Sequence, residues 1–485
     1  MKKRPRILVA NRSEIACRIF QSCRELDCVP VGLLAPGDEE ARHITMADEV
    51  IEVPSYLDAP AIVERAKKAK IDAVHPGYGF LSERGMFARA LEQAGLVFIG
   101  PRPETMEHLG GKVAAKEMAE KEGVPTVQWA KLSAAELADG KRLETEASRV
   151  GFPVLIKASA GGGGKGMRLI RQASEVAEAA ESASREAQSA FGDGTIFLER
   201  FVEKPRHVEV QIFGDGGGNA IHLFERECTL QRRHQKVVEE APCAFISEKT
   251  RKDLTDAALK LARATKYRSA GTVEFLVAPD GSIYFLEVNT RLQVEHPVTE
   301  WVTGLDLVKE QLKLALDPKS YKLPAVTSPR GHAIEVRLYA EDASRGFVPS
   351  PGRVEKLIWP SGPGIRVDSG VEIGQSITTL FDPMIAKLSV FGEDRASAIR
   401  RMLYALGETV IHGVGTNQEY LTHILSNTAV QAGAVDTKFL ERDFQFEPES
   451  AMEYAGESAT AFLPSRGSPS AGTQKTENVR SPWFS

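Results

Sequence analysis

The sequence predicts a mixed α/β protein of about three domains followed by a polar tail. The chain has 485 residues, of which 42% are hydrophobic and 26% are charged, and globular domains usually contain about 100–150 residues. Over the first 111 residues, short apolar runs alternate with segments of helical periodicity, and further along a glycine run lies between two strand-like runs. Alternation of this kind is typical of strands and helices packed in layers.

The first segment, residues 1–111, has the pattern of a parallel sheet covered by helices. The run RILVA at 6–10 is apolar throughout, as in a strand buried on both faces. Further strands are expected at 31–34, 73–74 and 97–99, and helices at 14–26, 60–70 and 86–94. This predicts a Rossmann-like domain. The turn after the first strand reads Asn11-Arg12-Ser13 and lacks the glycine fingerprint, so dinucleotide binding is not predicted.

The second segment, residues 112–320, contains the glycine run at 161–164 between strands expected at 154–158 and 167–170. Consecutive glycines let backbone amides approach a phosphate without obstruction by Cβ atoms. The run is not a Walker A loop, because Ser159 and Gly166 stand where that motif needs glycine and serine or threonine. We interpret it as the tip of a hairpin that closes over phosphates; the alternative is a flexible linker.

A second hairpin is expected from strands at 272–277 and 283–288, joined by the turn Pro279-Asp280-Gly281. Antiparallel pairing brings Glu274 and Glu287 together, and two adjacent carboxylates favour a bound cation such as Mg²⁺. Asn289 points to the same face as Glu287 if the strand continues. The alternative is a pair of exposed strand glutamates.

If the strand extends to residue 295, one face carries Glu287, Asn289, Arg291, Gln293 and Glu295. A guanidinium binds a small planar anion such as bicarbonate through two parallel hydrogen bonds. This pattern is compatible with Arg291 holding such an anion and Glu295 acting as a base toward it; the alternative is an ordinary solvated polar face.

The third segment, residues 330–442, is expected to be a mixed β/α domain. The tail at 446–485 is rich in serine, proline, glycine and glutamate, and is predicted to be disordered.

The composition bears on location and partners. With 61 basic and 66 acidic residues, the net charge of -5 argues against nucleic acid as the main partner. No apolar run is long enough for a membrane helix. Five scattered cysteines favour a reducing compartment over a disulfide framework. A cytoplasmic protein is therefore expected.

Seven stretches carry a resemblance to the biotin carboxylase family, a branch of the ATP-grasp superfamily. They are ANRSEIACRI (10–19), HPGYGFLSE (75–83), KASAGGGGKGM (157–167), RHVEVQ (206–211), QRRHQKVVEEAP (231–242), EVNTRLQVEHPVTE (287–300) and GHAIEVRLYAED (331–342). The resemblance covers about residues 5–442. It implies that the second segment is an ATP-grasp domain whose lid lies at about 130–203.

The resemblance also implies a role for individual residues. Those expected to bind ATP are Lys112, Lys157, Gly163, Gly164, Glu199, Arg200, Phe201, Val202, His207, Gln231, His234, Glu274 and Glu287. Those expected to bind Mg²⁺ or Mn²⁺ are Glu274, Glu287 and Asn289. Those expected to hold bicarbonate are Lys236, Arg291, Gln293, Val294 and Glu295, with Glu295 as base. Arg337 is expected to stabilise the biotin enolate, which makes Lys236, Arg291, Glu295 and Arg337 the candidate catalytic residues.

The implied activity is an ATP-dependent ligase reaction in which bicarbonate and ATP give carboxyphosphate, and biotin is then carboxylated. The chain contains no Ala-Met-Lys-Met motif, so biotin is expected on a separate biotin carboxyl carrier protein that also serves a carboxyltransferase. We expect the subunit of an acyl-CoA carboxylase in fatty acid biosynthesis, such as acetyl-CoA carboxylase, forming a homodimer with Arg18 and the third segment at the interface.

Three alternatives remain. The chain could instead be the biotin-carboxylating subunit of a two-subunit pyruvate or 2-oxoacid carboxylase. A non-catalytic nucleotide-binding scaffold would be expected to have lost one of the catalytic side chains, and all are present. An ATP-grasp ligase joining a carboxylate to an amine would leave the run from Arg291 to Pro297 unexplained.

Overall fold

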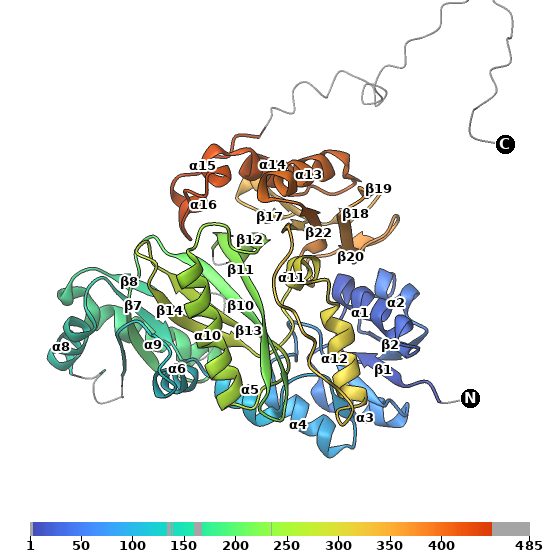
Figure 1. Ribbon diagram of the computed structural model, residues 1–485, viewed down its shortest axis with the longest axis horizontal. Helices are drawn as coiled ribbons and strands as arrows, with labels where there is room; N and C mark the ends of the chain where they lie inside the picture. The colour runs from blue at the N-terminus through green and yellow to red at the C-terminus, as the bar shows by residue number, and fades with distance from the viewer. Residues whose placement is uncertain (1–2, 133–136, 138, 160–166, 234, 449–485) are drawn as a thin grey trace, which may run out of the picture. The chain divides into compact units, whose positions relative to one another are not determined.

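The computed structural model describes residues 3–132, 137, 139–159, 167–233 and 235–448. Residues up to Phe446 form one compact unit (Figure 1). The tail predicted at 446–485 lies outside the described residues beyond residue 448. In the described part of the chain, no helix is both long and apolar enough to cross a bilayer. All five cysteines are buried and free.

The N-terminal segment is built on a five-stranded sheet in the order β3-β2-β1-β4-β5, and every strand pair is parallel. In β1, Ile7 and Val9 join one apolar cluster and Leu8 joins another, so the strand is buried on both faces as its apolar run predicts. The elements are β1 (Arg6–Val9), α1 (Ser13–Glu25), β2 (Val29–Leu34), α2 (Arg42–Met46), β3 (Glu49–Glu52), α3 (Ala59–Lys68), β4 (Ala73–His75), α4 (Gly85–Gln93), β5 (Val97–Phe98) and α5 (Pro103–Gly110).

A small antiparallel sheet in the order β6-β9-β7-β8 carries the glycine run. As expected, β7 and β8 pair antiparallel, with Leu155 opposite Leu169. The tip at 160–166, which includes Gly163 and Gly164, lies outside the described residues. The elements are α6 (Lys112–Lys121), β6 (Trp129–Lys131), α8 (Gly140–Val150), β7 (Val154–Ala158), β8 (Arg168–Ile170), a 3₁₀ turn (Ala173–Glu175), α9 (Val176–Phe191) and β9 (Ile196–Arg200).

An eight-stranded antiparallel sheet, in the order β14-β13-β10-β11-β12-β15-β22-β20, runs through the second and third segments. Helix α10 covers one face of it (Figure 1), because Leu254, Ala258 and Leu261 recur at helical spacing and join the same core as strand residues. The elements up to the segment end are β10 (Arg206–Asp215), β11 (Ala220–Arg232), β12 (Gln235–Ala241), α10 (Glu248–Ala264), β13 (Arg268–Val277), β14 (Ile283–Asn289), α11 (His296–Thr303) and α12 (Leu307–Leu316).

The third segment contributes the other end of this sheet, since β12 pairs with β15 and β15 with β22. The sheet therefore crosses the boundary that the sequence places near 320–330. Its elements are β15 (His332–Tyr339), β16 (Glu341–Asp342), a 3₁₀ turn (Ala343–Arg345), β17 (Val348–Pro349), β18 (Gly352–Arg353), β19 (Lys356–Ile358), β20 (Ile365–Ser369), β21 (Ser376–Ile377), β22 (Met384–Gly392), α13 (Arg395–Glu408), β23 (Val410–His412), α14 (Gln418–Ser426), α15 (Thr428–Gln431) and α16 (Phe439–Arg442).

One local expectation is wrong. The strand predicted from Glu287 to Glu295 ends at Asn289, and α11 begins at His296. Proline is favoured in the first turn of a helix, and Pro297 occupies that position. Residues 290–295, which we call the anion loop, are therefore an irregular connection between a strand and a helix.

Candidate active site

A cavity of about 400 Å³ lies between the small lid sheet and the eight-stranded sheet. Apart from Glu295, all of the described residues that the sequence assigns to nucleotide, metal, anion or biotin line this cavity. They are Lys112, Lys157, Glu199, Arg200, Phe201, Val202, His207, Gln231, Lys236, Glu274, Glu287, Asn289, Arg291, Gln293, Val294 and Arg337. His234 lies outside the described residues.

The lid side of the cavity holds a buried carboxylate between two ammonium groups. Lys157 Nζ lies 2.5 Å from one oxygen of Glu199, and Lys116 forms an ion pair with the other. Burial would raise the pKa of Glu199, but the two lysines lower it to about 2. Lys116 is only 2% exposed and was not singled out from the sequence, although it follows Lys112 by one helical turn. Lys157 thus has a fixed carboxylate partner at the cavity wall.

The two residues that follow Glu199 form backbone hydrogen bonds to two different segments of the chain. The amide of Arg200 donates to the carbonyl of Gln128 at 2.8 Å, and the amide of Phe201 donates to that of Pro153 at the same distance. This pairing sets the wall of the cavity at the end of β9.

Glu274 and Glu287 are opposite each other on β13 and β14, as the hairpin predicts. Burial would raise the pKa of Glu274, but Lys236 and His207 hold it well below its usual range. Burial raises the pKa of Glu287, and the charge on Glu274 raises it further. This repulsion is the electrostatic setting in which a divalent cation binds favourably, so the pair fits a metal ion.

Asn289, the third expected metal ligand, is engaged by its neighbours. Its amide nitrogen donates to Glu274 at 2.8 Å, and its side-chain oxygen accepts from Arg291 at 3.2 Å. Arg291 also donates to Gln293 at 2.9 Å, and its Nε lies 3.1 Å from Glu83. The anion loop thus brings its polar side chains together without the strand that was expected to align them.

Glu295 lies at the inner end of the site and is fully buried. One of its oxygens accepts from Lys236 at 2.6 Å and the other accepts from Arg337 at 3.0 Å. Burial would raise its pKa, but Lys236, Arg337 and Arg226 hold it well below the usual range. Glu295 is therefore anionic at neutral pH, the form that can accept a proton.

Lys236 is shared among three carboxylates. Besides Glu295, it donates to Glu209 at 2.5 Å and to Glu274 at 2.9 Å. Since each carboxylate accepts from the same ammonium, a change at one of them alters the hydrogen bonds that Lys236 makes to the others.

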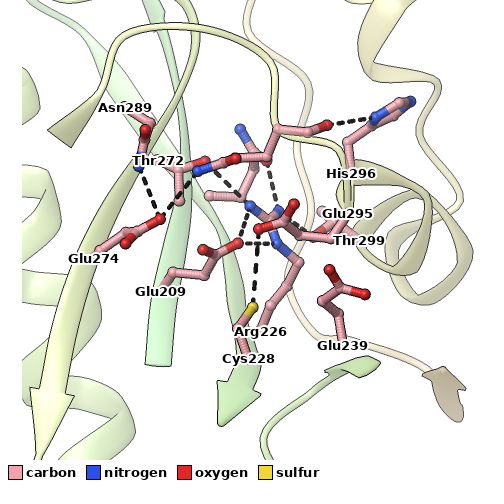
Figure 2. A network of polar contacts seen from close by, with 12 residues as sticks. Glu209, Arg226, Cys228, Glu239, Thr272, Glu274, Asn289, Glu295, His296 and Thr299 are labelled. Atoms are coloured by element: carbon pink, nitrogen blue, oxygen red, sulfur yellow. Dashed lines mark hydrogen bonds and ion pairs between the residues drawn. The ribbon is translucent and has the colours of Figure 1, made fainter. Parts of the chain in front are cut away.

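Three residues behind this cluster were missed from the sequence: Glu209, Arg226 and Glu239. Figure 2 shows Arg226 surrounded by Glu209, Thr272 and Thr299. Arg226 is fully buried, and Glu209 accepts from its Nε at 2.6 Å. Glu239 accepts from Arg337 Nε at 2.6 Å. The sequence signal for Glu209 is its place between Val208 and Val210 in a strand, where a buried charge needs a partner.

Three family models match consecutive parts of the chain. Family models match for the biotin carboxylase N-terminal domain over residues 3–106, for the ATP binding domain of the carbamoyl-phosphate synthase L chain over 111–324, and for the biotin carboxylase C-terminal domain over 335–442.

The biotin carboxylase of Halalkalibacterium halodurans is 45% identical over 445 residues, covering 90% of this chain and 97% of that protein. The alpha chain of human mitochondrial propionyl-CoA carboxylase is 46% identical over 446 residues, covering 90% of this chain and 60% of the human one.

Among solved structures, the biotin carboxylase domain dimer of Hydrogenobacter thermophilus 2-oxoglutarate carboxylase, in complex with MgADP, ADP and bicarbonate, matches with a TM-score of 0.86. The sequence identity is 41%, and the match covers 91% of this chain and 98% of that one. The chain belongs to the biotin carboxylase family and is an ATP-dependent enzyme of the ligase class.

Proposed function

We propose that this chain carboxylates biotin, using ATP and bicarbonate, on a separate biotin carboxyl carrier protein, as the first half-reaction of an acyl-CoA carboxylase. The observation that carries the proposal is the position of Glu295 between Lys236 and Arg337, behind a cavity that the lid lysines also line. A buried base next to two cations suits an anion that must lose a proton as it reacts.

The first stage joins bicarbonate to phosphate. Lys236, Arg291 and Gln293 hold bicarbonate, and Glu295 accepts its proton as a bicarbonate oxygen attacks the γ-phosphorus of ATP. The bond from that phosphorus to the β–γ bridging oxygen breaks, ADP leaves, and carboxyphosphate forms. Lys112 and Lys157 neutralise phosphate charge. Glu274 and Glu287, with Asn289, would hold Mg²⁺ or Mn²⁺, which supplies further charge neutralisation at the phosphates when bound.

The second stage transfers the carboxyl group. Carboxyphosphate splits into CO₂ and phosphate, and the phosphate takes the proton from the ureido nitrogen of biotin. Arg337 stabilises the negative oxygen of the resulting enolate, and the nitrogen attacks CO₂ to give carboxybiotin. Because carboxyphosphate reacts with water, closure of the lid hairpin β7–β8 over the cavity would protect it.

The proposal also concerns the molecule that finally receives the carboxyl group. The human propionyl-CoA carboxylase alpha chain supports an acyl-CoA as the acceptor. The 2-oxoglutarate carboxylase domain keeps a 2-oxoacid as a second candidate. Identifying the carboxyltransferase that co-purifies with the chain, and assaying it on acyl-CoAs and on pyruvate or 2-oxoglutarate, distinguishes the two.

A homodimer is part of the proposal, supported by the dimer named for that 2-oxoglutarate carboxylase domain. Arg18, expected at the interface, is only 6% exposed and forms ion pairs with Glu300 and Asp306 of the same chain. The third segment is therefore the better candidate for the contact, and sedimentation analysis tests the assembly.

The activity is tested by ADP release in the presence of Mg²⁺, bicarbonate and free biotin. The wild-type protein should release ADP only with bicarbonate, and faster with biotin. Arg337→Ala should lose biotin carboxylation while it still binds ATP. Arg345→Ala, at an exposed arginine of the same segment, is the matched control. Absence of bicarbonate-dependent ADP release from the wild-type protein would refute the proposal.

A further inference from the structure

Two cations of the third segment lie directly opposite each other in the large sheet. Arg337 on β15 and Lys387 on β22 are register partners in an antiparallel pair. Like charges in opposite positions destabilise a sheet, and Lys387 is only 1% exposed, so water screens its charge poorly. Such a pair is tolerated where each cation has a strong partner of its own.

The two side chains contact successive residues of the anion loop. Arg337 donates to the Glu295 carboxylate at 3.0 Å, and Lys387 Nζ donates to the backbone carbonyl of Val294 at 2.6 Å. A hydrogen bond from an ammonium is stronger than one between neutral groups. The end of the anion loop is thus held from the third segment at both a side chain and the backbone.

The carboxylate of Asp368 does not replace this bond. It lies 3.7 Å from Lys387 Nζ and is already bound by Arg366, at 3.0 Å and 2.8 Å. Tyr78 presents its ring 5.8 Å from the ammonium. Desolvating an ammonium is costly unless it is hydrogen-bonded, and the Val294 carbonyl provides the shortest of these contacts.

We propose that Lys387 is a positioning residue of the bicarbonate site. By holding the peptide between Val294 and Glu295, it fixes the backbone from which the Glu295 carboxylate projects. Residues 290–295 contain side chains proposed to hold bicarbonate and none of those proposed to hold ATP, so loss of this anchor should act on bicarbonate more than on ATP. The inference rests on the proposed assignment of the anion loop to bicarbonate.

The test compares Lys387→Met, which removes the donor, with Lys387→Arg, which keeps charge and donors. KM for bicarbonate and KM for ATP are measured by ADP release in degassed buffer with added bicarbonate. Lys387→Met should raise the KM for bicarbonate about tenfold or more and leave the KM for ATP within about twofold. Lys387→Arg should return the KM for bicarbonate to within about threefold of wild type.

Ser389→Ala is the matched control, because Ser389 is also a buried polar residue of β22 but bonds Trp301 rather than the anion loop. It should change neither KM. Thermal unfolding establishes that each variant is folded, and Lys387→Leu, which also lacks a donor, replaces Lys387→Met in the same comparison if the latter does not fold.

A folded variant lacking the lysine whose KM for bicarbonate is unchanged, or whose two KM values rise together, overturns the inference. So does an arginine variant that behaves like the methionine variant. Failure of the wild-type protein to release ADP with bicarbonate instead refutes the proposed function, so the two failures are distinguishable.

Discussion

The ammonium of Lys236 lies 2.6 Å from the carboxylate of Glu295. The same carboxylate accepts from Arg337 through its other oxygen, so the proposed base is bound by two of the cations that are proposed to serve bicarbonate and biotin. Bicarbonate bound beside Glu295, as proposed, would compete for these hydrogen bonds. The proposed base and the proposed anion site share the same two cations, so removal of either part should affect the other.

Glu295→Gln should abolish most of the bicarbonate-dependent release of ADP. The amide cannot accept the proton, and loss of a general base costs about 100-fold or more in rate. ATP binding, measured by calorimetry, should stay within about twofold of wild type. Glu310→Gln is a control at a buried glutamate bonded to Tyr321 and Lys313, away from the cavity. Retention of more than half of the ADP release by Glu295→Gln would show that another group takes the proton.

Local patterns in the sequence were enough to predict the parallel sheet and the proximity of Glu274 and Glu287. An apolar run such as that around Leu8 reports burial on both faces. The turn at Gly281, whose positive φ of 84° suits glycine, sets the register as far as Phe275 opposite Phe285. A β-bulge next to Phe275, which the pattern does not report, then brings Glu274 opposite Glu287. Neither inference required a contact with a distant part of the chain.

The anion loop could not be predicted in this way. Its alternating polar residues fit a strand, but the strand ends at Asn289 and a helix begins at His296. Groups that are distant in the sequence hold the loop between them. Lys387 contacts Val294 across 93 residues of sequence, and Arg337 contacts Glu295 across 42. Periodicity reports which face of an element is buried, and it does not report which distant side chain lies against it.

Glu287→Gln should remove the repulsion between the two facing carboxylates. We expect the variant, in the presence of a chelator, to be more stable than wild type by about 1 kcal/mol. Added Mg²⁺ should stabilise wild type and have much less effect on the variant. Thermal unfolding with and without Mg²⁺ measures both effects. Glu248→Gln, at a side chain that is 89% exposed, is the control, and an equal response of wild type and Glu287→Gln to Mg²⁺ would contradict a metal site at this pair.

Glu239 should make the stability of the protein depend on pH near neutrality. Burial raises its pKa to about 7, against the opposing charge of Arg337, and Glu295 adds to the rise. Glu335 is its register partner across β12 and β15. The usual pKa is 4.5, so between about pH 4.5 and about pH 7 Glu239 is protonated in the folded protein and ionised in the unfolded chain. The contribution of Glu239 to the free energy of unfolding therefore decreases as pH rises from about 4.5 to about 7, and is constant above that.

Glu239→Gln keeps the neutral form at every pH and should remove this slope, which is at most about 1.4 kcal/mol per pH unit for one proton. Urea unfolding of wild type and variant, from about pH 5 to about pH 8, measures the difference between the two curves. A constant difference across that range would mean that Glu239 does not change its protonation there.

Arg226→Met should destabilise the fold strongly, because it leaves the Glu209 carboxylate buried with Lys236 as its remaining cation. Arg226 is fully buried and donates to Glu209, Gln211, Thr272 and Thr299. Breaking a buried ion pair by removing one partner costs about 3–5 kcal/mol, and urea unfolding measures the loss. The double variant Arg226→Met with Glu209→Gln removes both charges and should recover a large part of it, since a pair replaced together leaves no uncompensated charge. Additive losses in the double variant would show that the two side chains contribute independently, and that Glu209 depends on Lys236 rather than on Arg226.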